Sequence, residues 1–232
     1  MHTFFTQKIS NEVTLSEIES KHAIKVLRMA SGSVVRIIDG KGSEGQGLIS
    51  DAHPKRCQIQ IKSIVYKEKP TCEIAIALAP TKNNDRTEWF LEKATEIGIT
   101  HFIPLICENS ERKKFNNERW NKVAISALKQ SQRLWLPTIS LPIKLNEFVK
   151  ENTYKNRFIA HCEDGDKKEL KDYLDITKDQ LIIIGPEGDF SPNEIELALK
   201  NSFTAVSLGD NRLRTETAGI VACTIMKFQS KN

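Results

Sequence analysis

The chain has 232 residues, of which 39% are hydrophobic and 28% charged, with a formal net charge of +4. This length suits one large domain or two smaller ones, with enough apolar content for a packed core. No apolar run approaches the roughly 18–20 residues of a membrane helix, so we expect no membrane association. The first residues lack a signal-peptide pattern, and the five cysteines are far apart in the sequence. We therefore expect a protein of the reducing cytoplasm, with no zinc site and no disulfide framework.

Residues 1–70 are predicted to form a small β-rich domain. A helix is expected from Ser16 to Leu27, because Ser16 and Glu19 have capping-box spacing. Short strands joined by glycine turns then suggest a barrel, with strands at 33–39, 48–49 and 57–65 and a turn-rich stretch at 40–47. The whole excess of Lys and Arg over Asp and Glu lies in residues 1–70, which suits an anionic partner such as RNA. An ordinary solvated surface is the alternative.

From residue 71 onward, apolar strands alternate with helices. The run 73–79 is almost continuously apolar, as in a strand covered on both faces. The predicted strands are 73–79, 102–106, 157–161, 181–184 and 205–208, and the predicted helices are 85–98, 120–131, one that begins at Ser191, and 216–228. This alternation predicts a mostly parallel, layered α/β domain over residues 71–232, with the polar segment 67–71 as a linker.

Two strand-loop-helix segments near the C-terminus are the strongest candidates for a functional site. They are 181–190, with the loop Gly185-Pro-Glu-Gly188, and 205–218, whose loop carries Arg212, Arg214 and Glu216. Ligands of open α/β sheets lie at the carboxyl ends of strands, where such loops gather. The alternative for the first loop is a generic strand-to-helix turn, and for the second a capped helix with surface charge. Neither loop has a dinucleotide or phosphate-loop glycine pattern, and no hydrolase elbow is present.

The two loops, Ile-Gly-Pro-Glu-Gly-Asp-Phe-Ser and Leu-Gly-Asp-Asn-Arg-Leu-Arg-Thr-Glu-Thr-Ala, resemble those of the RsmE family of ribosomal RNA methyltransferases, in the SPOUT superfamily. Residues 85–98, 119–133 and 22–28 match as well. The resemblance implies a knotted C-terminal SPOUT domain (71–232) and a PUA-like RNA-binding barrel (1–70). It also implies a homodimer that uses S-adenosylmethionine, without a metal, to methylate N3 of a uridine in 16S ribosomal RNA of the small subunit.

The residues expected to serve this activity fall into three groups. The first candidates for catalysis are Arg214 and Glu216, with Arg112 and Arg133 supplied by the other subunit. The cofactor is expected to contact the two loops and the ends of neighbouring strands, at Leu78, Thr81, His161, Glu163, Ile184, Gly185, Pro186, Glu187, Gly188, Leu208, Gly209, Leu213, Thr217 and Ala218. The basic residues His22, Lys25 and Arg28, placed on one helix, are expected to contact RNA phosphates; a plain solvated face is the alternative.

Methyl transfer to uridine N3 requires loss of the N3 proton, which spreads negative charge onto O2 and O4. The site therefore needs a base or cationic donors. An arginine stays protonated, so Arg214 is expected to stabilise charge, and the base is left unassigned. Two other functions stay open: an enzyme with a different nucleotide cofactor, and an RNA-binding or assembly protein without catalysis.

Overall fold

The computed structural model describes residues 1–111, 115–175 and 177–229. The chain divides into two compact units, each described below by itself. The first contains Met1–Lys69 and Ile125–Leu136, and the second contains Pro70–Ala124 and Pro137–Asn232. Among the helices of the described residues, none has the length and apolar character needed to cross a membrane.

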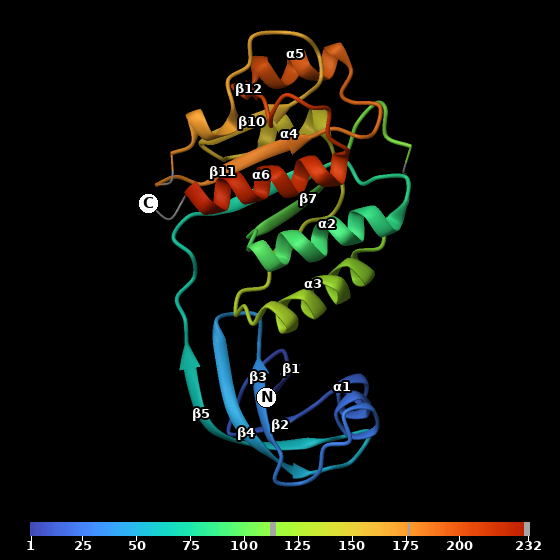
Figure 1. Ribbon diagram of the computed structural model, residues 1–232, viewed down its shortest axis with the longest axis vertical. Coiled ribbons are helices and arrows are strands. Elements are labelled where there is room, and N and C mark those ends of the chain that lie inside the picture. The colour runs from blue at the N-terminus through green and yellow to red at the C-terminus, as the bar shows by residue number, and fades with distance from the viewer. Residues whose placement is uncertain (112–114, 176, 230–232) are drawn as a thin grey trace. The chain divides into compact units, whose positions relative to one another are not determined.

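The described residues of the first unit form a curled mixed sheet (Figure 1). Its strands are β1 (His2–Phe5), β2 (Glu12–Thr14), β3 (Val34–Ile38), β4 (Ser43–Asp51) and β5 (Gln58–Tyr66). They lie in the order β1-β3-β4-β5-β2, with β1 parallel to β3 and the other pairs antiparallel. Each strand contributes a side chain to one buried core, namely Phe4, Val13, Val35, Ile49 and Ile59. The predicted barrel-type module is confirmed.

The glycine-rich stretch 40–47 differs from the prediction, because most of it belongs to the nine-residue strand β4. Gly47 lies in the strand where a Cβ atom would come 2.6 Å from the carbonyl oxygen of Gln60 on β5. A Cβ on Gly45 would lie 3.2 Å from Ile9. These glycines therefore permit close packing inside the sheet, and only the start of the stretch turns.

The predicted helix at 16–27 begins as expected, and Ser16 Oγ accepts a hydrogen bond from the Glu19 amide at 3.3 Å. It is built from α1 (Glu17–Lys21) and a π-helical turn η1 (His22–Val26). The expectation that His22, Lys25 and Arg28 share one helix is wrong. Arg28 lies beyond the last turn with φ of 54°, while His22 and Lys25 lie on η1. His22, Lys25 and Arg28 are all exposed.

The second unit contains a parallel sheet in the order β12-β10-β11-β6-β7-β8, with β9 also paired to β7. The strands are β6 (Ile74–Leu78), β7 (His101–Ile106), β8 (Thr138–Ile139), β9 (Ile143–Lys144), β10 (Asn156–Ala160), β11 (Gln180–Ile184) and β12 (Thr204–Val206). The helices are α2 (Asn84–Ile97), α4 (Leu145–Glu151), the 3₁₀ turn η2 (Leu170–Tyr173), α5 (Pro192–Lys200) and α6 (Thr215–Gln229). Helix α3 (Asn117–Ser131) is divided between the two units. The predicted parallel α/β sheet is confirmed.

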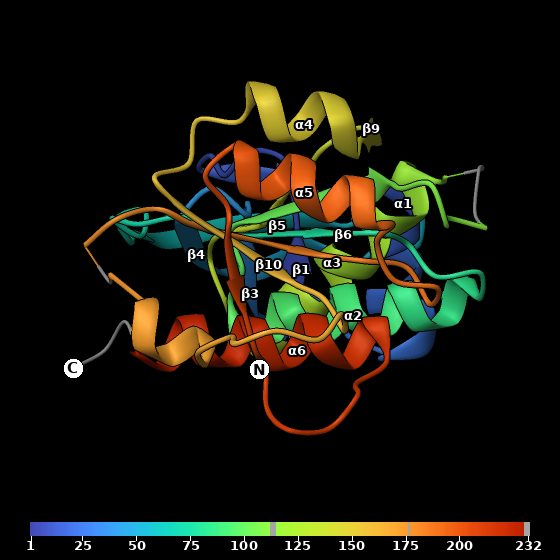
Figure 2. The same ribbon diagram turned by 90° about the horizontal axis from the view of Figure 1, so that it is seen from above.

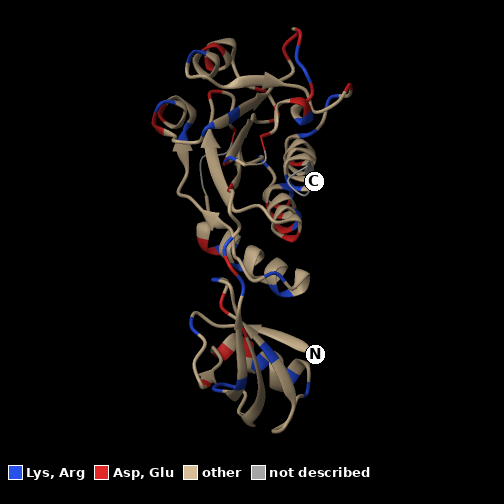
Figure 3. Cartoon of the chain, turned by 90° about the vertical axis from the view of Figure 1, so that its left-hand side faces the viewer, with Lys and Arg blue, Asp and Glu red and all other residues tan. Residues whose placement is uncertain are grey.

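Helices cover both faces of this sheet. Figure 2 shows α4 and α5 on one face and α2 and α6 on the other. The central strands β6 and β11 are buried along their whole length, as their apolar sequences predict. In the second unit, charged residues gather on the helices and loops, while the strands carry few of them (Figure 3). Most charged side chains of this unit are therefore available at its loops and helix faces.

Local capping signals set several helix ends of the second unit. Helix α5 has the full predicted capping box between Ser191 and Glu194, with Pro192 in its first turn. Helix α2 ends at Gly98, which has φ of 110°, as predicted. Its N-cap is Asn83 in place of the expected Asp85, because the Asn83 side chain accepts the Asp85 amide at 2.9 Å. Helix α4 lies in a segment for which no element is predicted.

Candidate functional site

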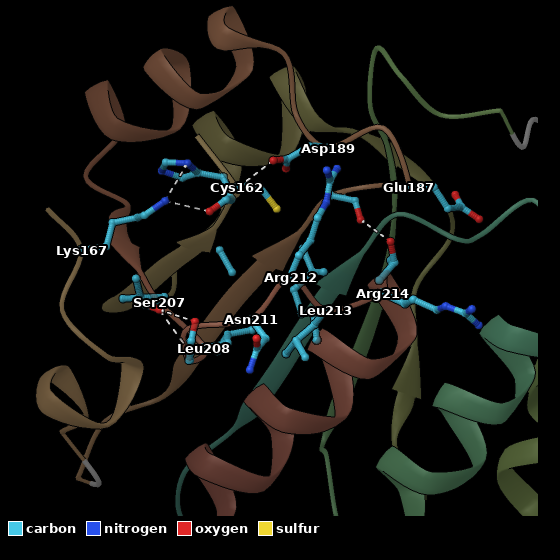
Figure 4. A pocket seen from close by; sticks show the side chains of 18 of the residues that line it. Cys162, Lys167, Glu187, Asp189, Ser207, Leu208, Asn211, Arg212, Leu213 and Arg214 are labelled. Atoms are coloured by element: carbon cyan, nitrogen blue, oxygen red, sulfur yellow. Dashed lines mark hydrogen bonds between the residues drawn. The ribbon is translucent and has the colours of Figure 1, made fainter. Parts of the chain in front are cut away.

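The carboxyl ends of β10, β11 and β12 surround a cavity of about 690 Å³ (Figure 4). Because these strands are parallel neighbours, the loops that follow them lie at the same edge of the sheet. The loops that line the cavity are 161–167 after β10, 185–189 after β11 and 207–214 after β12. The first turn of α6 completes it with Thr215 and Ala218. The two loops selected from the sequence are therefore brought together.

A hydrogen bond joins the two predicted loops directly. The hydroxyl of Thr215 donates to the carbonyl oxygen of Gly185 at 3.1 Å, and Thr215 is buried. On the other side of the second loop, Ser207 donates its amide to Lys168 and its carbonyl oxygen accepts from Leu170. The segment from Ser207 to Thr215 is thus held between the loop after β10 and the loop after β11.

Asp189 fixes the first loop to its neighbour. Its Oδ2 accepts the Cys162 amide at 2.7 Å and its Oδ1 accepts the Phe190 amide at 2.8 Å. Asp189 itself has φ of 62°, a conformation that non-glycine residues seldom adopt. The adjacent Gly185 is tightly surrounded, since a Cβ atom there would lie 3.1 Å from the Phe190 nitrogen. The carboxylate therefore holds a strained turn in one shape.

Glu187 connects the same loop to the strand on its other side. Its Oε1 accepts the backbone amide of Lys82, which follows β6, at 3.1 Å. Sequence reasoning places Glu187 among the residues that contact the cofactor. The structure shows the loop contact, and Glu187 also lies at the cavity lining. Its carboxylate thus braces the cavity rim.

His161 and Lys167 form the wall contributed by the loop after β10. Lys167 Nζ donates to the carbonyl oxygens of His161, at 2.9 Å, and of Glu163. Burial, together with the nearby Lys167 ammonium group, lowers the pKa of His161 below its ordinary value of 6.5. His161 is therefore neutral at pH 7.

The structure places the sequence-predicted cofactor residues in two sets. Those that line the cavity are His161, Ile184, Gly185, Pro186, Glu187, Leu208, Gly209, Leu213 and Ala218. Those that do not line it are Leu78, Thr81, Glu163, Gly188 and Thr217. Leu78 is fully buried beneath α6, and Thr81 is buried in hydrogen bonds to Thr87 and Asn83 in the turn before α2.

Several cavity residues are not among those predicted. They include Ala160, Lys167, Asp189, Val206, Ser207 and Thr215. Asp189 and Ser207 each adjoin a predicted residue, so a wider window at each strand end would have included them. Lys167 has no local signal, because only the folding of the loop after β10 brings it to the cavity.

The catalytic candidates do not all lie together. Arg214 lines the cavity and also a neighbouring groove, which Glu216 lines as well. In Figure 4 the Arg214 side chain extends toward α2, whereas Arg212 points toward Asp189. Arg133 belongs to the first unit, and Arg112 lies outside the described residues. Within the described part of the chain, no group of three or more His, Cys, Asp or Glu side chains is placed to hold a metal ion.

Comparison with known proteins assigns both units to one family. The model of the RNA methyltransferase domain matches residues 67–227, and that of the RNA methyltransferase PUA domain matches residues 15–62. The chain belongs to this RNA methyltransferase family. The ribosomal RNA small subunit methyltransferase E of Rickettsia conorii is 31% identical over 220 residues, covering 92% of this chain and 88% of the relative.

Solved structures of RNA methyltransferases show the same fold. The probable rRNA-methyltransferase from Porphyromonas gingivalis has a TM-score of 0.92 and 37% identity, with both chains covered completely. The ribosomal RNA small subunit methyltransferase E from Neisseria gonorrhoeae, bound to S-adenosyl methionine, has a TM-score of 0.86 and 25% identity, covering 99% of this chain and 98% of that one. The first unit is thus a PUA-like barrel and the second a SPOUT-type knotted domain. In the second unit, hydrogen bonds hold the segment before α6 to the loops on both sides of it.

Proposed function

We propose that this chain is a methyltransferase that uses S-adenosylmethionine to methylate N3 of one uridine in the 16S ribosomal RNA of the small subunit. The observation that carries the proposal is the cavity between the loops of β10, β11 and β12 in a chain of the RNA methyltransferase family. The relative from R. conorii is named for small-subunit ribosomal RNA, and that from N. gonorrhoeae was solved with S-adenosyl methionine. Residues 1–70 are assigned to RNA binding and residues 71–232 to catalysis.

The residues of the cavity fit a nucleoside cofactor. Its volume of about 690 Å³ falls within the range of roughly 300–1,000 Å³ typical of small-molecule sites. Gly209 has φ of 116°, and no atom lies within 4 Å of the place where a side chain would begin, so its backbone is open to a ligand. Ile184, Leu208 and Ala218 supply apolar surface. Bound S-adenosylmethionine supplies a methyl group carried on its sulfonium sulfur. After methyl transfer, the rest of the cofactor is a neutral sulfide.

The role assigned to Arg214 is stabilisation of negative charge. The N3–H bond of uracil must break before N3 can form a bond to carbon, and the electron pair left on N3 is shared with O2 and O4. A guanidinium group that is already in place lowers the energy of this anion without reorganisation. Arg214 lies where the cavity meets the groove, so its charge is available to a base brought beside the cofactor.

The remaining expectations concern RNA and a second subunit. The side chains of His22, Lys25 and Arg28, none of them buried, are assigned to contacts with RNA phosphates. The protein is proposed to act in the cytoplasm as a homodimer formed through residues 71–232, with Arg133 of one protomer serving the site of the other. Molar mass measured by light scattering checks the dimer, since a monomer at working concentration would reject it.

The decisive experiment supplies S-adenosylmethionine with a labelled methyl group and small ribosomal subunits that lack the modification. Label should appear in 16S RNA, and mass spectrometry of the digested RNA should locate it on N3 of a single uridine. Free 16S RNA tested in parallel shows which form is the substrate. No label in either form would reject the enzyme and favour an RNA-binding protein without catalysis.

Cofactor class is tested separately by thermal unfolding. S-adenosylhomocysteine should raise the unfolding temperature, because a ligand bound only to the native state stabilises it by mass action. NAD serves as the matched control. Stabilisation by NAD but not by S-adenosylhomocysteine would favour an enzyme of another nucleotide-cofactor class.

A further inference from the structure

Next to the proposed cofactor cavity, the second unit contains a second, more open groove of about 590 Å³. It is lined by Asp85, Arg86 and Trp89 of α2, by residues 212–214, and by Glu216 and Thr217 of α6. Residues 212–214 also line the cofactor cavity, so the two cavities adjoin along this segment. A molecule in the groove would therefore lie beside the cofactor.

Glu216 is an unusual residue to find in this position. It is only 7% exposed, and its Oε2 is buried without a hydrogen-bond partner among the described residues. Its Oε1 lies 3.7 Å from Arg86 Nε, beyond hydrogen-bond distance. A buried carboxylate oxygen without a donor is costly, because its hydration is lost and not replaced. A ligand that donates a hydrogen bond here would satisfy this acceptor.

Trp89 gives the groove an aromatic surface. Its side chain is 44% exposed, although the next residue, Phe90, is fully buried in the core. Asp85, Arg86 and Trp89 share one face of α2, as residues three and four positions apart do. A large exposed indole beside guanidinium groups is the combination on which nucleic-acid bases stack.

We propose that this groove holds the target uracil base, stacked on Trp89 with its N3–H directed at the Glu216 carboxylate. The assignment rests on the proposed methyltransferase function and identifies its acceptor site. Glu216 takes the N3 proton, and the electron pair stays on the base, where Arg86 and Arg214 offset the charge on O2 and O4. N3 then forms a bond to the methyl carbon as the carbon–sulfur bond breaks, and that bond's electron pair remains on sulfur. The products are N3-methyluridine, S-adenosylhomocysteine and protonated Glu216.

The charges of the groove favour RNA over a protein partner. Two guanidinium groups, from Arg86 and Arg214, line the groove together with two carboxylates, one of which is buried. A nucleotide brings a phosphate for the arginines, a flat base for the indole and an imide N–H for the carboxylate. One ligand thereby matches all three features of the groove.

Substitution of Trp89 tests the stacking. In Trp89→Ala, KM for the RNA substrate should rise roughly 10-fold or more, as expected for loss of one stacked base. Trp89→Phe should restore most of the affinity, and S-adenosylhomocysteine should bind both variants normally by calorimetry. Leu199→Ala is the matched control, because Leu199 is 45% exposed on α5, outside both cavities. Unchanged RNA kinetics in Trp89→Ala would overturn the assignment.

Glu216→Gln tests the proton transfer. At pH 7, kcat should fall about 100-fold, within the usual contribution of a general base, while cofactor affinity is kept. The loss should shrink about tenfold for each unit of pH increase toward 9, because the base then ionises in solution without Glu216. A merely structural defect would not show this recovery, so a loss that persists at all pH values would contradict the role of Glu216.

Two further outcomes distinguish failure of the uracil site from failure of the proposed function. Wild-type protein that transfers no methyl group refutes the proposed function itself, before any variant is compared. If the wild-type protein is active and the Trp89→Ala substitution changes the oligomeric state, the groove is covered by a second copy of the chain. That result would overturn the uracil site and leave the methyltransferase function intact.

Discussion

Gly219 tests how closely α6 packs against Phe90 and Leu78 in the second unit. A Cβ atom at Gly219 would lie 2.6 and 2.8 Å from ring atoms of Phe90 and 2.9 Å from Leu78. Both neighbours are fully buried, and Phe90 packs edge-on against Phe102 at 5.5 Å between ring centres. These side chains cannot move aside freely, so Gly219→Ala should overpack the core at a cost of about 1–3 kcal/mol. The better helix propensity of alanine returns up to about 1 kcal/mol.

The net expectation for Gly219→Ala is a loss of up to about 2 kcal/mol in the free energy of unfolding. Urea unfolding of the second unit measures it, through a lower midpoint at unchanged slope. The control is a double-mutant cycle with Phe90→Leu, which removes the ring atoms that the new methyl group would meet. The cost of Gly219→Ala should be smaller in that background. A Gly219→Ala protein more stable than wild type would refute the packing argument.

Three other substitutions address the cavity. Arg214→Ala should lower turnover roughly 100-fold, as loss of a charge-stabilising donor does, with unchanged S-adenosylhomocysteine affinity by calorimetry; normal single-turnover rates would contradict this. Thr215→Val removes the 3.1 Å hydrogen bond to Gly185, and should lower unfolding free energy by about 1 kcal/mol and weaken cofactor binding. His161 has a folded-state pKa below 6.5, so the unfolded chain binds its proton more readily, and stability should fall as pH drops from 6.5 through the folded pKa. His161→Gln should flatten this dependence in urea midpoints measured from pH 5 to 8.

Local signals predicted much of the second unit because they act over a few residues. The capping box of Ser191 and Glu194 and the left-handed Gly98 fix two helix ends through neighbouring backbone atoms. The strands β6 and β11 could also be predicted from a few residues, because a strand covered on both faces is a nearly continuous apolar run. In β4 the glycine-rich local pattern predicted turns where the structure has a strand. Gly47 is there to meet β5, a contact that sequence spacing does not reveal.

The cofactor cavity was half predictable, and the reason lies in its construction. Leu208, Gly209 and Gly185 follow strands directly, so the rule for ligand sites at strand ends selects them. Lys167 contacts His161 within the loop after β10, and Asp189 in the loop after β11 contacts Cys162 of that loop. Such contacts depend on tertiary folding, and the pattern of residues along the chain carries no trace of them.

Residues 212–214 form the wall that the two cavities share. The segment that carries them is held by hydrogen bonds to other loops at Ser207 and at Thr215. General rules of chain connection would not have predicted a knotted domain of this type, because they treat knots as rare exceptions. Yet methyl transfer depends on positioning two reactants at contact distance with water excluded. A segment clamped at both ends, with Arg214 on it, meets that requirement better than a mobile loop. The hydrogen bonds at its two ends therefore fix the short segment that serves both the proposed methyl donor and its acceptor.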